Sequence, residues 1–120
     1  MFALLMGLKT IAPAALQRAM TEPQRVQVVD VNSLQSWLKA RVPGARHADP
    51  VAFVEADLPA DKDALLVFYC SNPMCRKAPN AARRAEKTGY RNVRVMSAGI
   101  SGWLSAGLPT ESGQEVAVAW

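Results

Sequence analysis

Apolar residues in this chain fall into short continuous runs, separated by segments in which they recur at helical spacing. Residues 26–31 and 65–69 are nearly continuous apolar runs rich in β-branched or aromatic side chains, which is typical of buried strands. Shorter runs at 45–47 and 92–96 are interpreted as two further strands. Strands that alternate with helices over short loops favour a mostly parallel sheet with helices on both faces. The predicted fold class is therefore α/β.

Helices are predicted between these strands. Spacing and capping residues place them over residues 14–20, after a cap at Asn32 or Ser33, from Asp49 and Pro50 onward, from the basic segment behind Cys70 to Thr88, and around Ile100 and Leu104. In the segment that begins at Asp49 and Pro50, the side chains of Val51, Phe53 and Val54 are available for the core. Trp37 and Trp103 are expected to be core anchors rather than substrate contacts.

The chain of 120 residues is long enough for one domain with a single hydrophobic core. No apolar stretch approaches the roughly 20 residues of a membrane span, so no span is expected. The first eight residues are apolar, but Lys9 follows them instead of preceding them. We interpret this segment as a short amphipathic extension or helix that packs on the domain. The alternative is a weak signal peptide, cleaved among the small residues Ala12, Ala14 and Ala15.

Cysteine usage argues against a disulfide framework and against a structural metal site. The chain has two cysteines, Cys70 and Cys75, and its one histidine, His47, is far from them in sequence. These are too few ligands for a structural zinc ion, so we expect neither a metal nor another cofactor. Cysteines without a disulfide framework favour a reducing compartment, and the expected location is cytoplasmic.

The net charge of +4 is unevenly distributed along the chain. Basic and acidic residues balance before Cys70, whereas seven basic and three acidic residues lie behind it. Arg83, Arg84 and Lys87 are interpreted as a solvated helix face. Few aromatic residues interleave with the charges, so no nucleic-acid partner is expected. A positive field at the mouth of an anion-processing loop accounts better for the clustering.

Cys70 directly follows the strand predicted at 65–69 and begins a loop that leads into a helix. The residues that follow it in this loop are Ser71, Asn72, Pro73, Met74, Cys75 and Arg76. Ligands of open α/β sheets bind at the carboxyl ends of the strands, and loop amides together with a helix N-terminus can hold an anion there. These amides are expected to lower the pKa of Cys70, which increases its nucleophilic thiolate. Arg76 is expected to hold an oxyanion through paired hydrogen bonds. The alternative is a small buried cysteine at the end of a core strand.

Five short motifs, in this order, resemble those of single-domain rhodanese-like (thiosulfate sulfurtransferase-like) proteins. They are Val29-Asp30-Val31-Asn32, Val42-Pro43-Gly44-Ala45, Phe68-Tyr69-Cys70, Gly89-Tyr90-Arg91-Asn92-Val93, and Ala98-Gly99-Ile100-x-x-Trp103-x-x-Ala106-Gly107-Leu108-Pro109. The resemblance covers residues 10–109, so we expect residues 1–9 to be an N-terminal extension and 110–120 a C-terminal tail. It implies the three-layer rhodanese fold.

Three positions depart from the family pattern. Asn32 replaces the arginine after the Asp-Val motif, and Arg41 replaces the histidine before the Pro-Gly-Ala turn. We expect both to alter structural hydrogen bonds rather than the chemistry. The loop has Cys-x5-Arg spacing, with Cys75 where the family's Cys-x4-Arg spacing places arginine. The related cell-cycle phosphatases and arsenate reductases use the longer spacing, which suits phosphate or arsenate, but rhodanese-like proteins with Asn-Pro-x-Cys inserted in this loop also exist.

By this resemblance, the Cys70 thiolate would take the outer sulfur of a small anionic donor such as thiosulfate. The resulting persulfide would pass its sulfur to cyanide or to a thiol acceptor, a protein thiol included. Arg76 would orient the donor, with Lys77 and Asp30 in supporting roles.

Two alternatives stay open. The first is a Cys-x5-Arg phosphatase or arsenate reductase, for which the loop offers no evident general acid. The second is a non-enzymatic redox or sulfur-relay module, in which Cys70 and Cys75 interconvert between dithiol and disulfide.

Overall fold

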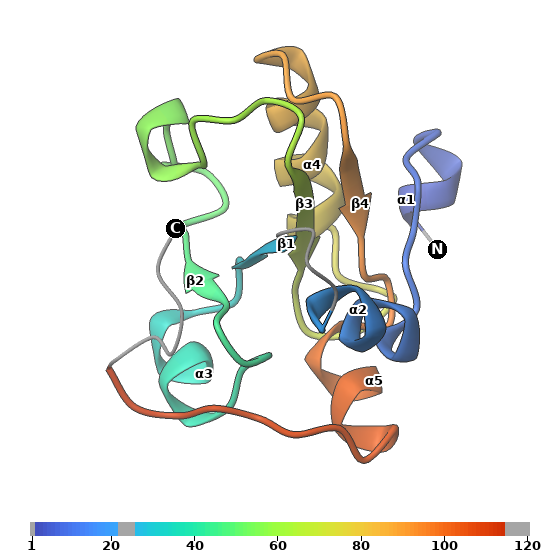
Figure 1. Cartoon of the computed structure of the whole chain (residues 1–120), viewed down its shortest axis with the longest axis vertical. Coiled ribbons are helices and arrows are strands. Elements are labelled where there is room, and N and C mark those ends of the chain that lie inside the picture. Colours follow the sequence, from blue (N-terminus) through green and yellow to red (C-terminus); the bar gives the residue numbers. More distant parts are fainter. Residues whose placement is uncertain (1, 22–25, 115–120) are drawn as a thin grey trace.

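The computed structural model describes residues 2–21 and 26–114, in which helices and strands alternate around one sheet (Figure 1). The elements are α1 (Phe2–Leu5), α2 (Pro13–Met20), β1 (Val26–Asp30), α3 (Leu34–Lys39), β2 (Arg46–His47), the 3-10 helix η1 (Glu55–Asp57), β3 (Leu65–Tyr69), α4 (Lys77–Lys87), β4 (Val93–Val95) and α5 (Gly99–Ser105). The four strands lie in the order β2-β1-β3-β4, and the three pairings between them are parallel. The predicted α/β class is confirmed.

Each face of the sheet packs against its own set of helices, because successive side chains of a strand point to opposite faces. On one face, Phe68 of β3 packs with the alanines of α4 and with Ala3 of α1. On the other face, Tyr69 of β3 packs with Leu16 of α2 and Trp103 of α5. Helices therefore cover both faces, as the sequence predicts.

Helix α4 lies close against the sheet because the side chains on its inner face are small. Its buried alanines recur at helical spacing, at positions 78, 81, 82 and 85. Behind its last residue, Lys87, Gly89 has a φ of +102°, a left-handed conformation that favours glycine. The helix therefore starts directly after the loop that carries the two cysteines and ends where the sequence predicts.

The segment after Asp49 is not the predicted helix. The Asp49 carboxylate accepts hydrogen bonds from the N–H groups of Val51 and Ala52 and so caps a single turn, which is followed by the three-residue η1. Phe53 is buried as expected, but Val51 and Val54 are exposed. Of the three apolar side chains available for the core, only Phe53 therefore joins it.

Arg84 of α4 provides the physical reason for this interruption. Its guanidinium donates hydrogen bonds to the carbonyl oxygens of Pro50, Val51 and Phe53 at 2.9 to 3.0 Å, which are acceptors that a continuing helix would use itself. Arg83 donates to a backbone carbonyl in the turn after α1. The predicted solvated face is present, since Arg84 and Lys87 are exposed and Arg83 is partly exposed, but the two arginines also tie α4 to neighbouring segments.

The two ends of the described chain are held to the rest of the protein in different ways. At the amino end, Ala3 and Leu8 are buried against the core. Near the carboxyl end, Glu111 forms an antiparallel bridge with the fully buried Arg41, whose Nε lies 2.8 Å from Oε1 of Glu111. Residues 115–120 of the expected tail lie outside the described residues. Among the described residues, none of the helices has the length and apolar content needed to cross a membrane.

Candidate active site

The cysteine loop, residues 70–76, leaves the carboxyl end of β3 and runs directly into α4. Helix α5 fixes its first residue, because the N–H of Ile100 donates to the carbonyl oxygen of Cys70 at 2.9 Å. Gly99 allows this close approach. Its φ is +66°, and a Cβ at this position would lie 2.5 Å from the carbonyl carbon of Ser71. The glycine of the Ala-Gly-Ile motif therefore seats the cysteine loop on α5.

Asn72 forms a tight turn inside the loop. Its carbonyl oxygen accepts the N–H of Cys75 at 3.1 Å, and its Oδ1 accepts the N–H of Met74 at 2.9 Å. The turn brings Cys75 back toward Cys70. These two loop amides are therefore already paired within the loop.

Other amides surround the two sulfur atoms at the amino end of α4. The thiol of Cys70 donates a hydrogen bond to Cys75, and the N–H of Ser71 is a partner of both sulfur atoms. The first two amides of α4 complete the set, that of Lys77 at Cys75 and that of Ala78 at Cys70. A helix N-terminus stabilises negative charge, so this arrangement favours one thiolate within the pair.

The structure favours the negative charge on Cys75, whereas the sequence predicts it on Cys70. Burial raises the pKa of Cys70 to about 12, and its hydrogen bond to Cys75 acts in the same direction. The pKa of Cys75 is lowered: burial raises it, but the hydrogen bonds from the Cys70 thiol and from the backbone of Lys77 and Ser71 outweigh that effect. Cys70 is 3% exposed, whereas Cys75 is half-buried. The prediction of a lowered pKa for Cys70 is therefore wrong.

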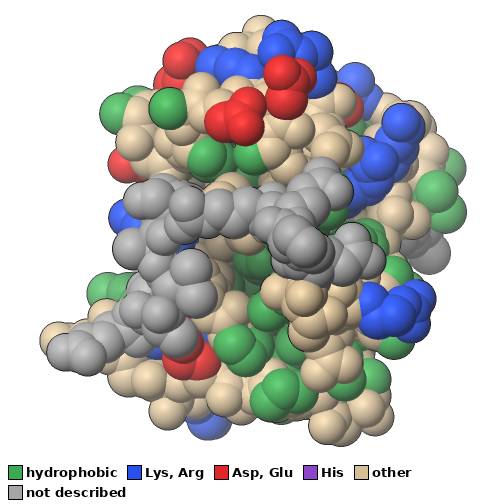
Figure 2. All heavy atoms as spheres, in the orientation of Figure 1, with side chains coloured by type: hydrophobic (Ala, Val, Ile, Leu, Met, Phe, Trp, Pro, Cys, Tyr) green, Lys and Arg blue, Asp and Glu red, His purple; other side chains and the backbone are tan. Residues whose placement is uncertain are grey.

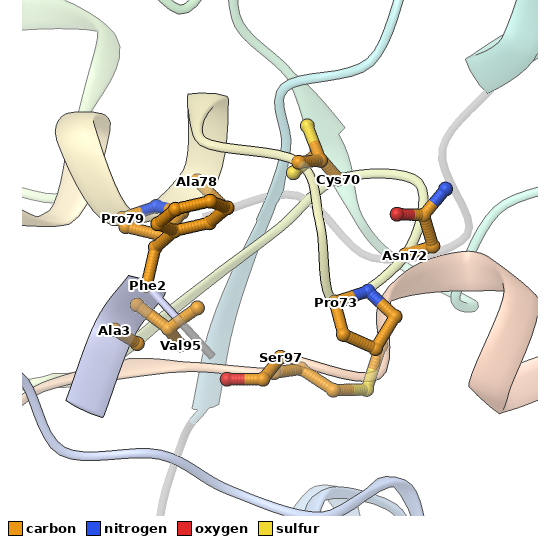
Figure 3. A pocket seen from close by; sticks show the side chains of 11 residues that line it. Phe2, Ala3, Cys70, Asn72, Pro73, Ala78, Pro79, Val95 and Ser97 are labelled. Atoms are coloured by element: carbon orange, nitrogen blue, oxygen red, sulfur yellow. The ribbon is translucent and has the colours of Figure 1, made fainter. Parts of the chain in front are cut away.

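A small cavity lies beside the sulfur atoms (Figure 3). Its volume is about 10 Å³, which is room for about one water molecule. The lining residues are Phe2, Ala3, Cys70, Asn72, Pro73, Cys75, Ala78, Pro79, Val95, Met96 and Ser97. Figure 3 shows the Phe2 ring beside Ala78 and Pro79. Because most of these side chains are apolar, the cavity suits a small and weakly hydrated group.

Seven of the lining residues were not predicted as site residues from the sequence, and two of them, Ser97 and Phe2, bear most on the chemistry. Ser97 follows β4, and its buried hydroxyl oxygen has no hydrogen-bond partner among the residues that the structure describes. Its place at the carboxyl end of a strand beside β3 was a usable signal. Phe2 offered none, because it reaches the site from a helix that is 68 positions away from Cys70 in sequence.

The predicted anion ligand Arg76 does not line the cavity. Its guanidinium carbon lies 4.4 Å from the centroid of the Phe2 ring, in a cation–π contact. Lys77 has an exposed side chain and meets the site through its backbone N–H. Met74 is exposed and also lies outside the cavity lining. To bind an anion at Cys70, Arg76 would have to leave Phe2.

Asp30 supports the cysteine loop from β1 without lining the cavity. Its buried carboxylate accepts hydrogen bonds from the N–H of Asn32 at 2.8 Å and from the hydroxyl of Tyr69 at 2.5 Å. Burial raises the pKa of this carboxyl group. The side-chain oxygen of Asn32 in turn accepts the hydroxyl of Ser71 at 2.7 Å. Asn32, which stands where the family pattern has arginine, thus joins the end of β1 to the loop.

Basic side chains are more dispersed than the predicted positive field requires. Figure 2 shows acidic side chains among the lysines and arginines on one face. Arg91 and Asp63 form an ion pair at 2.6 Å, and Arg83 lies 3.7 Å from Glu86. Any positive field at the cavity is therefore local to the start of α4. Within the described ranges, no group of three or more His, Cys, Asp or Glu residues is placed to hold a metal ion.

The structure defines the protein as a three-layer α/β domain, in which a parallel sheet lies between two helical layers. The central strand β3 ends at a cysteine beside the N-terminus of a helix. The family model of the rhodanese-like domain matches residues 12–106. The chain belongs to this family.

Curated relatives of the chain differ in their named activities. It is 35% identical over 98 residues to the HTH-type transcriptional regulator Rv0324 of Mycobacterium tuberculosis. The aligned region covers 79% of this chain but 42% of the regulator. It is 30% identical over 111 residues to arsenate reductase 2.1 of rice (Oryza sativa subsp. japonica), covering 82% of this chain and 68% of the relative. The thiosulfate sulfurtransferase GlpE of Haemophilus influenzae is 27% identical over 107 residues, 89% of this chain and 98% of the relative.

Solved structures show the same fold. The crystal structure of a thiosulfate sulfurtransferase from Pseudomonas aeruginosa matches with a TM-score of 0.78 and 27% identity, covering 91% of this chain and 20% of that one. The chain thus spans less than half of the regulator and a fifth of this structure.

Proposed function

We propose that this protein is a sulfurtransferase, which moves sulfane sulfur from a small anionic donor such as thiosulfate to cyanide or a thiol through a persulfide on Cys70. One observation carries the proposal: Cys70 lines a cavity of about 10 Å³ at the amino end of α4, with room for one small group. The similarity to two thiosulfate sulfurtransferases supports it.

The first half of the reaction forms the persulfide. As the Cys70 sulfur attacks the outer sulfur of thiosulfate, the Cys75 thiolate accepts its proton through the hydrogen bond that already joins them. The sulfur–sulfur bond of thiosulfate breaks, and sulfite leaves with the electron pair. The persulfide anion then lies near the amides of Ser71 and Ala78, and the hydroxyl of Ser97 is an additional donor in the cavity wall.

In the second half, an acceptor attacks the outer sulfur of the persulfide. Cyanide takes this sulfur and becomes thiocyanate, or an acceptor thiol takes it and becomes a persulfide. The Cys70 thiolate is regenerated in either case. Arg76 would stabilise the anionic donor on entry, since it is the guanidinium at the end of the cysteine loop.

An arsenate reductase or phosphatase is the second candidate, favoured by the Cys-x5-Arg spacing and by the similarity to the rice arsenate reductase. One observation disfavours it. Among the described residues, no Asp or Glu lines the cavity where a general acid would be needed.

Thiocyanate formation from thiosulfate and cyanide tests the proposal. The wild-type protein should form thiocyanate at a steady rate, and Cys70→Ser should fall to the uncatalysed background because the attacking sulfur is gone. Equal rates for the two proteins would contradict the proposal. Arsenate-dependent oxidation of a dithiol by the wild-type protein would then support the second candidate.

A further inference from the structure

We infer that Cys75 is a second catalytic residue, which attacks the Cys70 persulfide and releases the transferred sulfur as hydrosulfide. The product on the protein is a disulfide between Cys70 and Cys75. This inference rests on the proposed function, because it requires a persulfide on Cys70. It adds a sulfide-releasing activity to the transfer of sulfur to an external acceptor.

The geometry of the cysteine loop brings the two sulfur atoms together. The turn at Asn72, closed by the 3.1 Å hydrogen bond from the Cys75 amide, folds the loop back onto its own start. The two thiols hydrogen-bond to each other, share the Ser71 amide and line the same cavity. Cys75 therefore lies beside the sulfur atom that it would attack.

Access to the persulfide favours this internal attack. Cys70 is 3% exposed, and the cavity next to it has room for one small group. A persulfide would occupy that space, so an acceptor thiol from outside would have to compete with Cys75, which already lines the cavity. Cys75 needs no entry path, and its lowered pKa favours the loss of its proton as its sulfur attacks.

The proposed step balances in atoms and electrons. Persulfide formation leaves the Cys70 persulfide as an anion and Cys75 as a thiol. The sulfur of Cys75 bonds to the inner sulfur of the persulfide, on Cys70, and the bond between the inner and outer sulfur breaks. The outer sulfur leaves with the electron pair and the Cys75 proton as hydrosulfide. Two cysteine sulfurs are oxidised to a disulfide, and the sulfane sulfur is reduced to sulfide.

Renewed turnover requires a reductant of the dithiol class. A small dithiol, or a protein with two neighbouring thiols, would exchange with the Cys70–Cys75 disulfide and restore both thiols. The complete cycle would then reduce thiosulfate to sulfite and sulfide at the expense of that dithiol.

A single-turnover experiment without oxygen tests the inference. Reduced, thiol-free protein is mixed with thiosulfate, sulfide is measured over time, and samples are alkylated and analysed by intact-mass spectrometry. The wild-type protein should release one equivalent of sulfide and become a form that lacks two hydrogens and resists alkylation. Cys75→Ser and Cys75→Ala lack the thiolate that takes the Cys70 proton, so they should gain one sulfur more slowly, but they should keep it and release at least tenfold less sulfide. A wild-type sample without thiosulfate measures disulfide formed by adventitious oxidation.

The possible failures are distinguishable. A wild-type protein that keeps its added sulfur as long as the two Cys75 variants do, without releasing sulfide, overturns the inference and leaves the proposed function standing. If the wild type and both variants gain no sulfur, the proposed function fails and the inference fails with it. Sulfide release from Cys75→Ala at the wild-type rate also overturns the inference. The wild-type result alone decides the matter should either variant fold poorly.

Discussion

Cys70 and Cys75 have the same side chain, yet their surroundings differ enough to separate their chemistry. Cys70 is enclosed by the sheet and α4, and burial raises its pKa to about 12. Cys75 is half-buried and receives hydrogen bonds from the Cys70 thiol and from the backbone, which lower its pKa. The first proton lost as the pH rises therefore comes from Cys75.

Alkylation rates measured from pH 6 to 10 should reveal this order. In Cys70→Ser, whose hydroxyl can still donate to residue 75, iodoacetamide should modify Cys75 with a midpoint below the ordinary thiol value of about 8.5. In Cys75→Ser the rate for Cys70 should still be rising at pH 10, because burial, the larger cause of its raised pKa, remains. Near pH 7.5 the two rates should differ by at least about tenfold, since one pKa unit changes the thiolate fraction tenfold. Coincident midpoints would contradict the prediction.

At this scale, the sequence was sufficient to predict where Cys70 lies but not its ionisation. An apolar run followed by a loop and a helix predicts a cysteine at the carboxyl end of a strand, and Cys70 lies there. The pKa depends on burial by residues that are distant in sequence, among them Ala3, and on the turn that Asn72 forms inside the loop. Neither effect has a local sequence signal.

Helix α1 is the element whose role is furthest from the expectation of a plain extension. It packs on the domain as expected, but Phe2 and Ala3 also form one wall of the candidate active site. The Phe2 ring holds the guanidinium of Arg76 at 4.4 Å. The helix thus narrows the cavity, and its Phe2 ring engages the guanidinium of Arg76 that an incoming anion would use.

Phe2→Ala should therefore strengthen the binding of thiosulfate. Removing the ring frees Arg76 and enlarges the cavity beside Cys70. A cation–π contact at an exposed site contributes about 1 kcal/mol, so KM for thiosulfate should fall by about fivefold. Steady-state kinetics over a range of thiosulfate concentrations measure this change.

Leu5→Ala is the matched control for this experiment. It removes a large apolar side chain from the same helix, but Leu5 is 77% exposed and does not line the cavity. Its KM should equal that of the wild type. An unchanged KM in Phe2→Ala, or the same decrease in both variants, would show that the contact with Arg76 does not limit anion binding.

The other departure at this scale concerns the segment after Asp49. Periodicity and an initial Asp-Pro pair predict a helix there, but local patterns cannot show that Arg84, 34 positions beyond Pro50, takes up the carbonyl groups. The strands and α4 were predictable because the apolar composition and spacing of each segment indicate its burial. The sequence of the segment after Asp49 contains no signal for a distant guanidinium that competes for its backbone acceptors.

Across the whole molecule, Arg41 links the chain near its carboxyl end to the strands that carry the site. Its guanidinium contacts Oε1 of Glu111 at 2.8 Å and the carbonyl oxygen of Gly113 at 2.7 Å. The next residue, Val42, donates its N–H to the hydroxyl of Tyr69, which in turn donates to Asp30. A buried polar network therefore runs from the last described residues to the ends of β1 and β3.

Loss of the carboxylate at position 111 should destabilise the entire domain. Glu111→Ala removes the carboxylate that pairs with the fully buried guanidinium of Arg41, and breaking a buried pair in this way costs about 3 kcal/mol or more. Urea unfolding at neutral pH should show this loss in the free energy of unfolding. Glu55→Ala is the matched control, because it removes an exposed ion pair with Lys62 at 3.0 Å and should cost less than about 1 kcal/mol. If the two variants lose equal stability, Glu111 is an ordinary surface contact, and the segment after α5 does not hold the domain together.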